Sequence, residues 1–257
     1  MLNNLKRNAG PDFLGIGVAR SGTTTAYKVL KNHPDVYMPD KKELHFFTFA
    51  QQSYQNQPAA LKIMEEQYRG MFSEKGQRMA GEISPSYFYF PGAAKKIHLF
   101  NPWLKIFCIL RNPVDRALSD FYYAGLDKKV SIDAFFSRGV QDLQHNKLVL
   151  KPFSASAILY KGFYRHHVEN YLNQFSSDQL MLLPFSLLQK DIDQFFMTLF
   201  SFLDLGTETA KLSVKENSAK YPTSSNDGAV RDMLEVFYRD EISFYSALEK
   251  EYGCHQE

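Results

Sequence analysis

A run of small, hydroxyl and basic residues near the start of the chain has the composition of an anion-binding loop. It follows a short apolar run, Phe13 to Val18, and precedes apolar residues at helical spacing, which predicts a strand, a tight turn and a helix. The free N–H groups and the dipole of a helix N-terminus favour a bound phosphate. The candidate residues are Arg20, Ser21, Gly22, Thr23, Thr24 and Thr25.

The spacing of this loop matches a nucleotide-binding P-loop, but its chemistry differs. From Gly17 the pattern is Gly-x-x-x-x-Gly-Thr-Thr, so Thr23 replaces the P-loop lysine and the cation is Arg20. No apolar run ending in aspartate follows, which argues against a magnesium-dependent NTPase or kinase. The remaining alternative for the loop alone is a solvated glycine turn before an ordinary helix.

A second basic residue follows another predicted strand. The apolar run from Leu104 to Leu110 ends at Arg111, and Asn112-Pro113 is a typical helix start. Ser119 lies two turns along this helix, away from its apolar stripe. Because ligands bind at the carboxyl ends of strands in open α/β sheets, Arg111 and the Arg20 loop should share one crevice.

Two further segments carry carboxylates. Glu43 and His45 precede two phenylalanines, and in an extended chain their side chains would point to the same side. They are either charged groups in a solvated loop or a base and its partner near the basic loop. Glu82 ends a short predicted strand before Ser84-Pro85. It either acts on substrate or holds a loop through backbone N–H groups.

Composition limits the class of protein. The 257 residues include 44% hydrophobic residues, enough for a sizeable core, and no repeat or linker divides them, so one domain spanning 1–257 is expected. A net charge of +2 does not indicate a nucleic-acid partner, and two cysteines give no disulfide framework. No segment has the pattern of a signal peptide or a membrane span, which predicts a cytoplasmic protein.

The rest of the chain predicts elements without chemistry of their own. A strand is expected near 179–183, an apolar helix over 192–200 and one last helix over about 228–250. Residues 51–75 suggest a surface helix, and 126–158 reads as an irregular, acceptor-facing insertion. Metal ligands are not expected, since the adjacent histidines at 166 and 167 cannot share a helical face.

Taken together, these motifs resemble those of the sulfotransferases that use 3′-phosphoadenosine 5′-phosphosulfate (PAPS), in their bacterial and glycan-type branch. The resemblance covers Pro11 to about Tyr252. Arg20-Ser-Gly-Thr-Thr is similar to the family's 5′-phosphosulfate loop. The segment ending at Ser119, eight residues after Arg111, is similar to its 3′-phosphate motif. Lys42-Glu-Leu-His-Phe-Phe is similar to the segment that supplies the catalytic glutamate.

Two later segments extend the resemblance. Gly162-Phe-Tyr164 is similar to the segment whose tyrosine contacts the adenine, and Lys220-Tyr221-Pro222 to the loop that folds over the nucleotide. The resemblance implies an α/β fold, a P-loop-like three-layer sandwich with a central parallel sheet flanked by helices. It also implies metal-free, in-line transfer of a sulfuryl group from PAPS.

The resemblance assigns roles to the candidate residues. Arg20 and its loop would hold the phosphosulfate, Arg111 and Ser119 the 3′-phosphate, and Glu43 would be the base. His45 is the second choice as base, or an orienting partner. Substrate contacts are expected from Glu82, Ser84 and Phe47.

Three positions depart from the family pattern. Many members have lysine where this chain has Arg20, and glycan-type members often have aspartate where it has Thr48. Their Glu-Lys-x-Pro segment has Ile83 in place of lysine. The acceptor is therefore expected to be handled differently from a sulfated glycan. A small molecule, a carrier-bound metabolite or a glycan-like acceptor, sulfated on oxygen or nitrogen, stays open, as does a non-catalytic nucleotide-binding protein on this fold.

Overall fold

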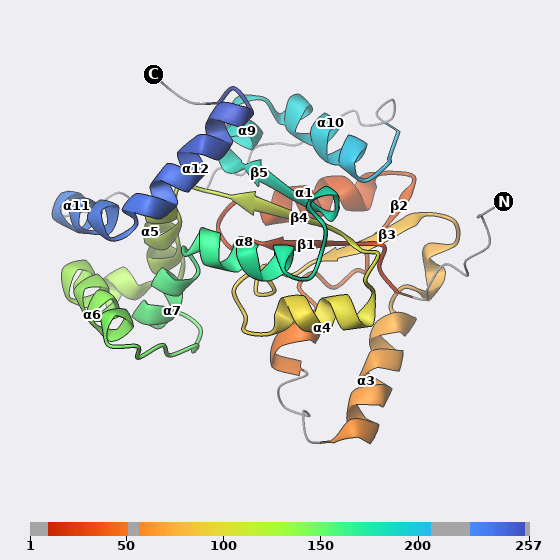
Figure 1. Cartoon of the computed structure of the whole chain (residues 1–257), viewed down its shortest axis with the longest axis horizontal. Helices are drawn as coiled ribbons and strands as arrows, with labels where there is room; N and C mark the ends of the chain where they lie inside the picture. Colours follow the sequence, from red (N-terminus) through yellow and green to blue (C-terminus); the bar gives the residue numbers. More distant parts are fainter. Residues whose placement is uncertain (1–9, 51–56, 207–226, 255–257) are drawn as a thin grey trace.

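Five parallel strands form one central sheet in the order β2-β3-β1-β4-β5 (Figure 1). The computed structural model describes residues 10–50, 57–206 and 227–254. Parallel pairing places the carboxyl ends of neighbouring strands at one edge of the sheet. The strands are β1 (Phe13–Gly17), β2 (Val36–Tyr37), β3 (Met79–Ile83), β4 (Lys105–Leu110) and β5 (Leu180–Pro184).

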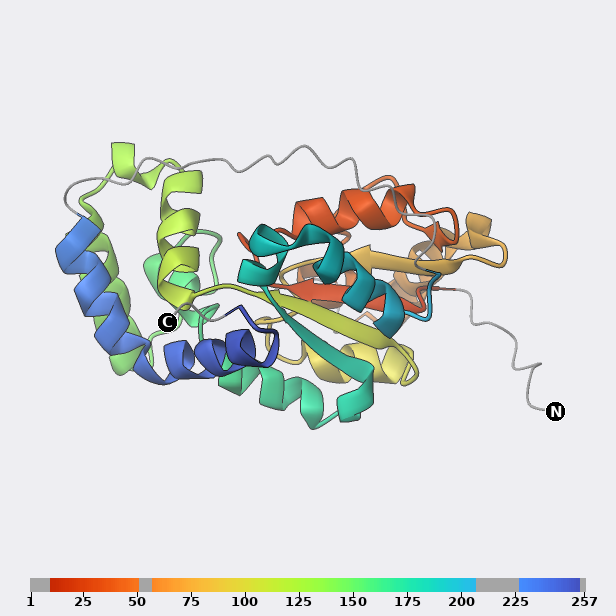
Figure 2. The same cartoon turned by 90° about the horizontal axis from the view of Figure 1, so that it is seen from above.

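Helices cover both faces of the sheet, so the predicted three-layer α/β sandwich is confirmed (Figure 2). The helices are α1 (Thr23–Asn32), α3 (Pro58–Gly70), α4 (Ala93–Phe100), α5 (Pro113–Tyr123), α6 (Ile132–Gln144), α7 (Ala155–Tyr160), α8 (Tyr164–Leu172), α9 (Phe185–Lys190), α10 (Ile192–Phe202), α11 (Asp227–Phe237) and α12 (Arg239–Glu251), with short helical turns η1 (Phe46–Ala50), η2 (Ser73–Lys75), η3 (Leu126–Lys128) and η4 (Ser177–Gln179).

The strand β4 shows how the sheet builds two cores. Ile106 and Cys108 pack with α4 and α8 on one face, and Phe107 and Ile109 pack with α1 and α10 on the other. Alternate residues of a strand point to opposite faces, so a strand covered on both sides must be apolar throughout. This is why the sequence of β4 is a continuous apolar run. Among the described helices, none has the length and apolar composition to cross a membrane.

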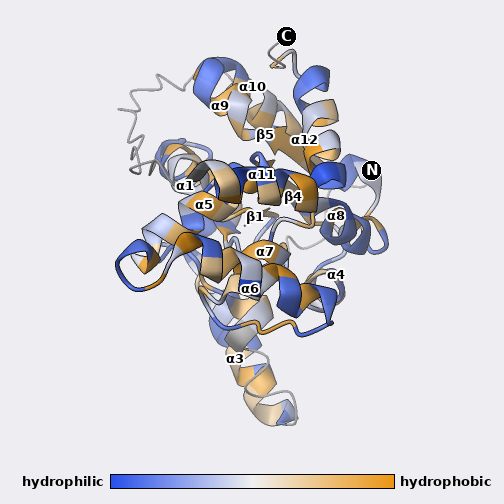
Figure 3. Cartoon of the chain, turned by 90° about the vertical axis from the view of Figure 1, so that its left-hand side faces the viewer, coloured by the Kyte–Doolittle hydropathy of each residue, from blue (hydrophilic) through white to orange (hydrophobic). Residues whose placement is uncertain are grey.

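A third apolar cluster lies beside the sheet, where α5, α6, α7 and α11 pack together (Figures 1 and 3). Here the expectation of an irregular segment over 126–158 was wrong, because Ile132 to Gln144 forms the helix α6. Its buried residues Ile132, Phe136 and Gly139 recur at helical spacing, a signal that the sequence carries. The lysines of the segment, at 128, 129, 147 and 151, lie before and after this helix.

The last helix also differs from expectation. It is divided into α11 and α12 at Tyr238, whose ring is fully buried and whose hydroxyl donates to Leu159 O at 2.5 Å. A single straight helix would not bring this side chain between α7 and α8. The predicted helix over 192–200 is confirmed as α10, and the strand near 179–183 as β5.

A glycine in β3 is required by the core. A Cβ on Gly81 would overlap the ring of Phe13 on the paired strand β1. We expect Gly81→Ala to lower the free energy of unfolding by about 1–3 kcal/mol, measured by denaturant unfolding, because the buried ring must move. Gly70→Ala is the control, since its Cβ would meet open space at the end of α3. Equal stability of the two variants would contradict the packing described.

Candidate active site

The loop after β1 has the geometry of an anion site. Gly22 adopts φ +82° at the N-cap of α1, and no side chain of the described residues caps that first turn. The φ angle favours glycine, and a Cβ here would lie 2.5 Å from Leu188. Ser21 is fully buried, and its hydroxyl has no hydrogen-bond partner in the part of the chain that is described. The loop therefore presents backbone N–H groups and one unsatisfied hydroxyl.

Two arginines and a serine meet at this loop. Arg20 Nε donates to Ser119 Oγ at 3.3 Å, and Arg111 Nη1 donates to Arg20 O at 3.0 Å. The loop after β1 and the β4–α5 junction thus come together, as the sheet order requires. Burial lowers the pKa of Arg111, while Asp115 opposes this shift. A partly desolvated cation of this kind is stabilised by a bound anion.

Two hydrogen bonds fix the backbone on either side of the Arg111 side chain, one made by Asn112 and one by Tyr164. Asn112 caps α5, its Oδ1 accepting from Val114 N at 3.0 Å, as its position before Pro113 predicts. Tyr164 is fully buried, and its hydroxyl donates to Arg111 O at 2.7 Å. In this structure Tyr164 therefore holds the backbone of Arg111 through a buried hydrogen bond. The contact of Tyr164 with adenine, which the resemblance implies, stays a prediction.

Glu43 and His45 come together, although not through an extended backbone. Both adopt left-handed conformations, with φ +63° and +54°. His45 Nε2 lies 3.5 Å from Glu43 Oε2, and Lys42 Nζ contacts Glu43 Oε1. Arg20 also has a positive φ of 71°. Non-glycine residues held in this region are strained, and such residues concentrate at functional sites.

The carboxylate of Glu82 anchors the segment that carries Glu43 and His45. Its Oε1 accepts from the hydroxyls of Tyr68 at 2.9 Å and Tyr87 at 2.6 Å. Its Oε2 accepts from Ser84 Oγ at 2.7 Å and from Leu44 N at 3.3 Å. Burial raises the pKa of Glu82, and these hydrogen bonds oppose the shift. Of the two alternatives for this residue, the loop-holding one is what the structure shows.

The residues expected to contact substrate lie in the interior instead. Glu82 is only 2% exposed, and Ser84 and Phe47 are fully buried. Ser84 Oγ accepts from His45 N at 3.1 Å, and the Phe47 ring packs against Tyr87 at a centroid distance of 5.4 Å. All three side chains hold the Glu43–His45 segment in place, because their polar and apolar groups are used by neighbours within the protein.

Sequence reasoning missed two sets of residues. Ser86 Oγ lies 2.7 Å from His45 Nδ1 and so orients the ring. Asp120 Oδ2 accepts from Lys161 Nζ at 2.9 Å and from Arg116 Nη1 at 3.2 Å, all three being buried. Arg116 and Asp120 are four residues apart, which is also the spacing of ion pairs on exposed helix surfaces. Their burial, which the sequence does not show, distinguishes this pair from a surface ion pair. This buried network joins α5 to the turn before α8.

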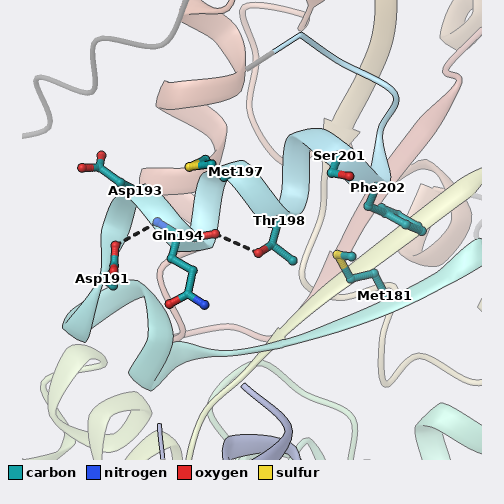
Figure 4. Close-up of a pocket in the computed structure, with 8 residues that line it drawn as sticks. All are labelled: Met181, Asp191, Asp193, Gln194, Met197, Thr198, Ser201 and Phe202. Atoms are coloured by element: carbon teal, nitrogen blue, oxygen red, sulfur yellow. Dashed lines mark hydrogen bonds between the residues drawn. The ribbon is translucent and has the colours of Figure 1, made fainter. Parts of the chain in front are cut away.

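One hollow in the surface lies apart from these groups. A cavity of about 770 Å³ runs between β5 and one side of α10, and Met181 and Met197 line it (Figure 4). It shares no residue with the site at the ends of β1, β3 and β4. The predicted nucleotide-covering residues Lys220, Tyr221 and Pro222 lie outside the described residues.

Comparisons with known proteins agree on one family. A family model described as the sulfotransferase domain matches residues 10–238. The crystal structure of a sulfotransferase from Alicyclobacillus acidocaldarius is similar, with a TM-score of 0.73, 26% sequence identity and coverage of 96% of this chain and 97% of that chain.

Curated relatives are similar over shorter stretches. Heparan sulfate glucosamine 3-O-sulfotransferase 6 of Mus musculus is 32% identical over 175 residues, which is 66% of this chain and 45% of that protein. A membrane-associated sulfotransferase of Dictyostelium discoideum is 31% identical over 114 residues, 44% of this chain and 23% of that protein. The matches thus span less than half the length of both relatives.

The charges around His45 predict how its titration responds to substitution. Burial lowers the pKa of His45 from its ordinary value of 6.5, Glu43 raises it, and Lys42 and Lys41 lower it. We expect Glu43→Gln to move this pKa further down and Lys41→Gln to move it up, measured by NMR titration of the imidazole at low ionic strength. A rise on removing Glu43 would contradict the Glu43–His45 contact.

Proposed function

The chain belongs to the sulfotransferase domain family, and from this premise we propose that it transfers a sulfuryl group from PAPS to a hydroxyl or amine of an acceptor. The observation that carries the proposal is the meeting of Arg20, Arg111 and Ser119 beside an uncapped helix N-terminus. A donor with phosphates at two positions requires cations and hydroxyls in two places within one crevice. We also propose that the chain forms a single sulfotransferase domain.

The residues at the loop fit such a donor. The buried and unsatisfied Ser21 hydroxyl and the N–H groups of Thr23 to Thr25 would bind the 5′-phosphosulfate, together with Arg20. Arg111 and Ser119 would bind the 3′-phosphate. PAPS supplies an activated sulfuryl group whose leaving group is a phosphate oxygen. Arg20 and the loop N–H groups would stabilise the charge that develops on that oxygen.

The base would lie on the β3 side of β1, opposite the β4 side that carries Arg111. Glu43 is partly exposed beside His45, and the turn after β3 holds His45 through Ser84 and Ser86. We assign Glu43 as the base that takes the acceptor's proton, and His45 as the partner that orients its carboxylate. The rival activity, magnesium-dependent ATP use, would require the P-loop lysine that Thr23 replaces.

The first test is the binding of adenosine 3′,5′-bisphosphate (PAP), the product of the donor. At about 100 times its Kd, PAP should raise the melting temperature by roughly 5–10 °C, because a ligand specific for the native state adds about 2.7 kcal/mol. AMP and Mg·ATP at equal concentration should have smaller effects. A shift with Mg·ATP alone would favour a kinase and overturn the proposal.

The assignment of Arg111 predicts a loss of affinity. Arg111→Ala should weaken PAP binding about tenfold or more, measured by calorimetry, because a charge-assisted contact to phosphate is lost. Arg138→Ala is the matched control, since this arginine is exposed on α6 and pairs with Asp142 one turn along the same helix. Unchanged affinity in Arg111→Ala would remove this residue from the phosphate site.

The assignment of Glu43 predicts a loss of turnover without loss of binding. With any acceptor that the unaltered protein sulfates, Glu43→Gln should lower kcat by a factor of about 10² or more, since a positioned base is removed. Its affinity for PAP should stay the same. A variant that turns over normally would exclude Glu43 as the base.

A further inference from the structure

One short segment contacts both ends of the Arg111–Ser119 motif. It comprises residues 158–164, from the end of α7 to the first residue of α8, and we call it the anchor segment. At one end of the motif, Tyr164 donates its buried hydroxyl to Arg111 O at 2.7 Å. At the other end, the contacts go through Asp120, which follows Ser119 on α5. Helix α7 packs beside α5 in the third apolar cluster, which makes these contacts possible (Figure 1).

Three buried ionic side chains make the connection at the Ser119 end. Asp120 Oδ2 accepts from Lys161 Nζ at 2.9 Å and from Arg116 Nη1 at 3.2 Å. Arg116 Nη2 also donates to Ile158 O. Arg116 is fully buried, Asp120 is 2% exposed and Lys161 is 7% exposed. The turn of α5 that carries Ser119 is therefore bonded to the anchor segment at two points.

The anchor segment is itself fixed by further buried contacts. The Tyr238 hydroxyl donates to Leu159 O at 2.5 Å, and His167 Nε2 lies 2.9 Å from Tyr160 O. A Cβ on Gly162 would lie 2.7 Å from the hydroxyl oxygen of Tyr238, so the segment packs directly against that side chain. The segment cannot shift without breaking several buried hydrogen bonds, so it gives both ends of the motif one fixed reference.

Stability alone does not account for ionic groups at this place. Buried ion pairs stabilise a fold no better than apolar side chains of similar volume, because the charges lose their hydration. Directional bonds do fix the rotation of a helix about its axis. A rotation of α5 would move Ser119 Oγ away from Arg20 Nε, which donates to it at 3.3 Å. In addition, Asp120 balances only one of the two cations, Arg116 and Lys161, so the group favours an anion beside Ser119.

We propose that Lys161 and Tyr164 are positioning residues that set the spacing between Arg111 and Ser119, and that this spacing gives the protein its preference for a nucleotide with a 3′-phosphate. The inference rests on the proposed function, in which Arg111 and Ser119 bind that phosphate. Lys161 and Tyr164 act through these two residues, because their own polar groups are bonded to Asp120 and to Arg111 O. AMP has no 3′-phosphate, so its affinity should not depend on the spacing.

The test compares the affinities for PAP and AMP, measured by calorimetry, in Lys161→Met and Tyr164→Phe. Lys161→Met removes one contact between α5 and the anchor segment, and Asp120 keeps Arg116 as its partner. Tyr164→Phe keeps the ring and removes only the hydroxyl that holds Arg111 O. In each variant the affinity for PAP should fall about tenfold, because a charge-assisted contact to phosphate is misplaced, while the affinity for AMP stays the same.

Lys75→Met is the matched control for the loss of a buried lysine. Lys75 is 7% exposed, and its Nζ lies 3.2 Å from Oδ2 of Asp12, which precedes β1 at the amino ends of the strands. This variant should lose stability and keep the ratio of the AMP and PAP Kd values. Each of Lys161→Met and Tyr164→Phe decides the role of its own residue. An unchanged ratio, or an equal loss of affinity for both nucleotides, would overturn the positioning role.

A second measurement separates this inference from the proposed function. The Nε–H group of Arg20 donates to Ser119 Oγ in the free protein, and its exchange with solvent can be followed by NMR. Exchange should be about tenfold faster in Lys161→Met and unchanged in Lys75→Met, because a displaced Ser119 no longer protects the proton. Failure of PAP to bind the unaltered protein would overturn the proposed function, and the exchange would still decide whether Lys161 positions Ser119. Equal exchange rates in the two variants would overturn that positioning.

Discussion

The site depends on one constraint, the parallel pairing of β1 with β3 on one side and β4 on the other. Backbone hydrogen bonding brings the carboxyl ends of these three strands to one edge of the sheet. The loop after β1 carries Arg20, the loop after β4 carries Arg111, and Glu82 and the turn after β3 hold Leu44 and His45. Since the strands are buried on both faces, their relative positions cannot shift without disrupting two cores.

Two buried carboxylates then fix the segments that leave the sheet. Glu82 satisfies three hydroxyls and one backbone N–H, and thereby holds the strained segment of Glu43 and His45. Asp120 satisfies Arg116 and Lys161, and so joins the helix that carries Ser119 to the turn before Tyr164. Removing one partner from such a group leaves a buried charge unsatisfied, so both carboxylates specify the geometry of the site strongly.

Local patterns in the sequence were sufficient for most of the fold. The apolar run of β4, the Asn112-Pro113 helix start and the glycine loop before α1 are each encoded by adjacent residues, and the structure has all three. Helix α6 was also encoded locally, by Ile132, Phe136 and Gly139 at helical spacing, but the basic residues before and after it favoured an irregular segment. The division of the last helix at Tyr238 was not encoded locally, because it depends on contacts of Tyr238 with Leu159 in α7 and with Phe163 at the start of α8.

The sequence by itself determined the fold class, the strand, turn and helix around Arg20, and the meeting of Arg20 with the Arg111–Ser119 motif, because each rests on local propensity and on the fixed geometry of parallel sheets. Only the tertiary structure decided which polar residues face inward. Glu82 and Ser84 are buried and hold the segment of Glu43 and His45, and Ser86 contacts the His45 ring. Burial and long-range contact are properties of the packed chain, and residues some 40 positions apart carry no mutual signal in their local sequence.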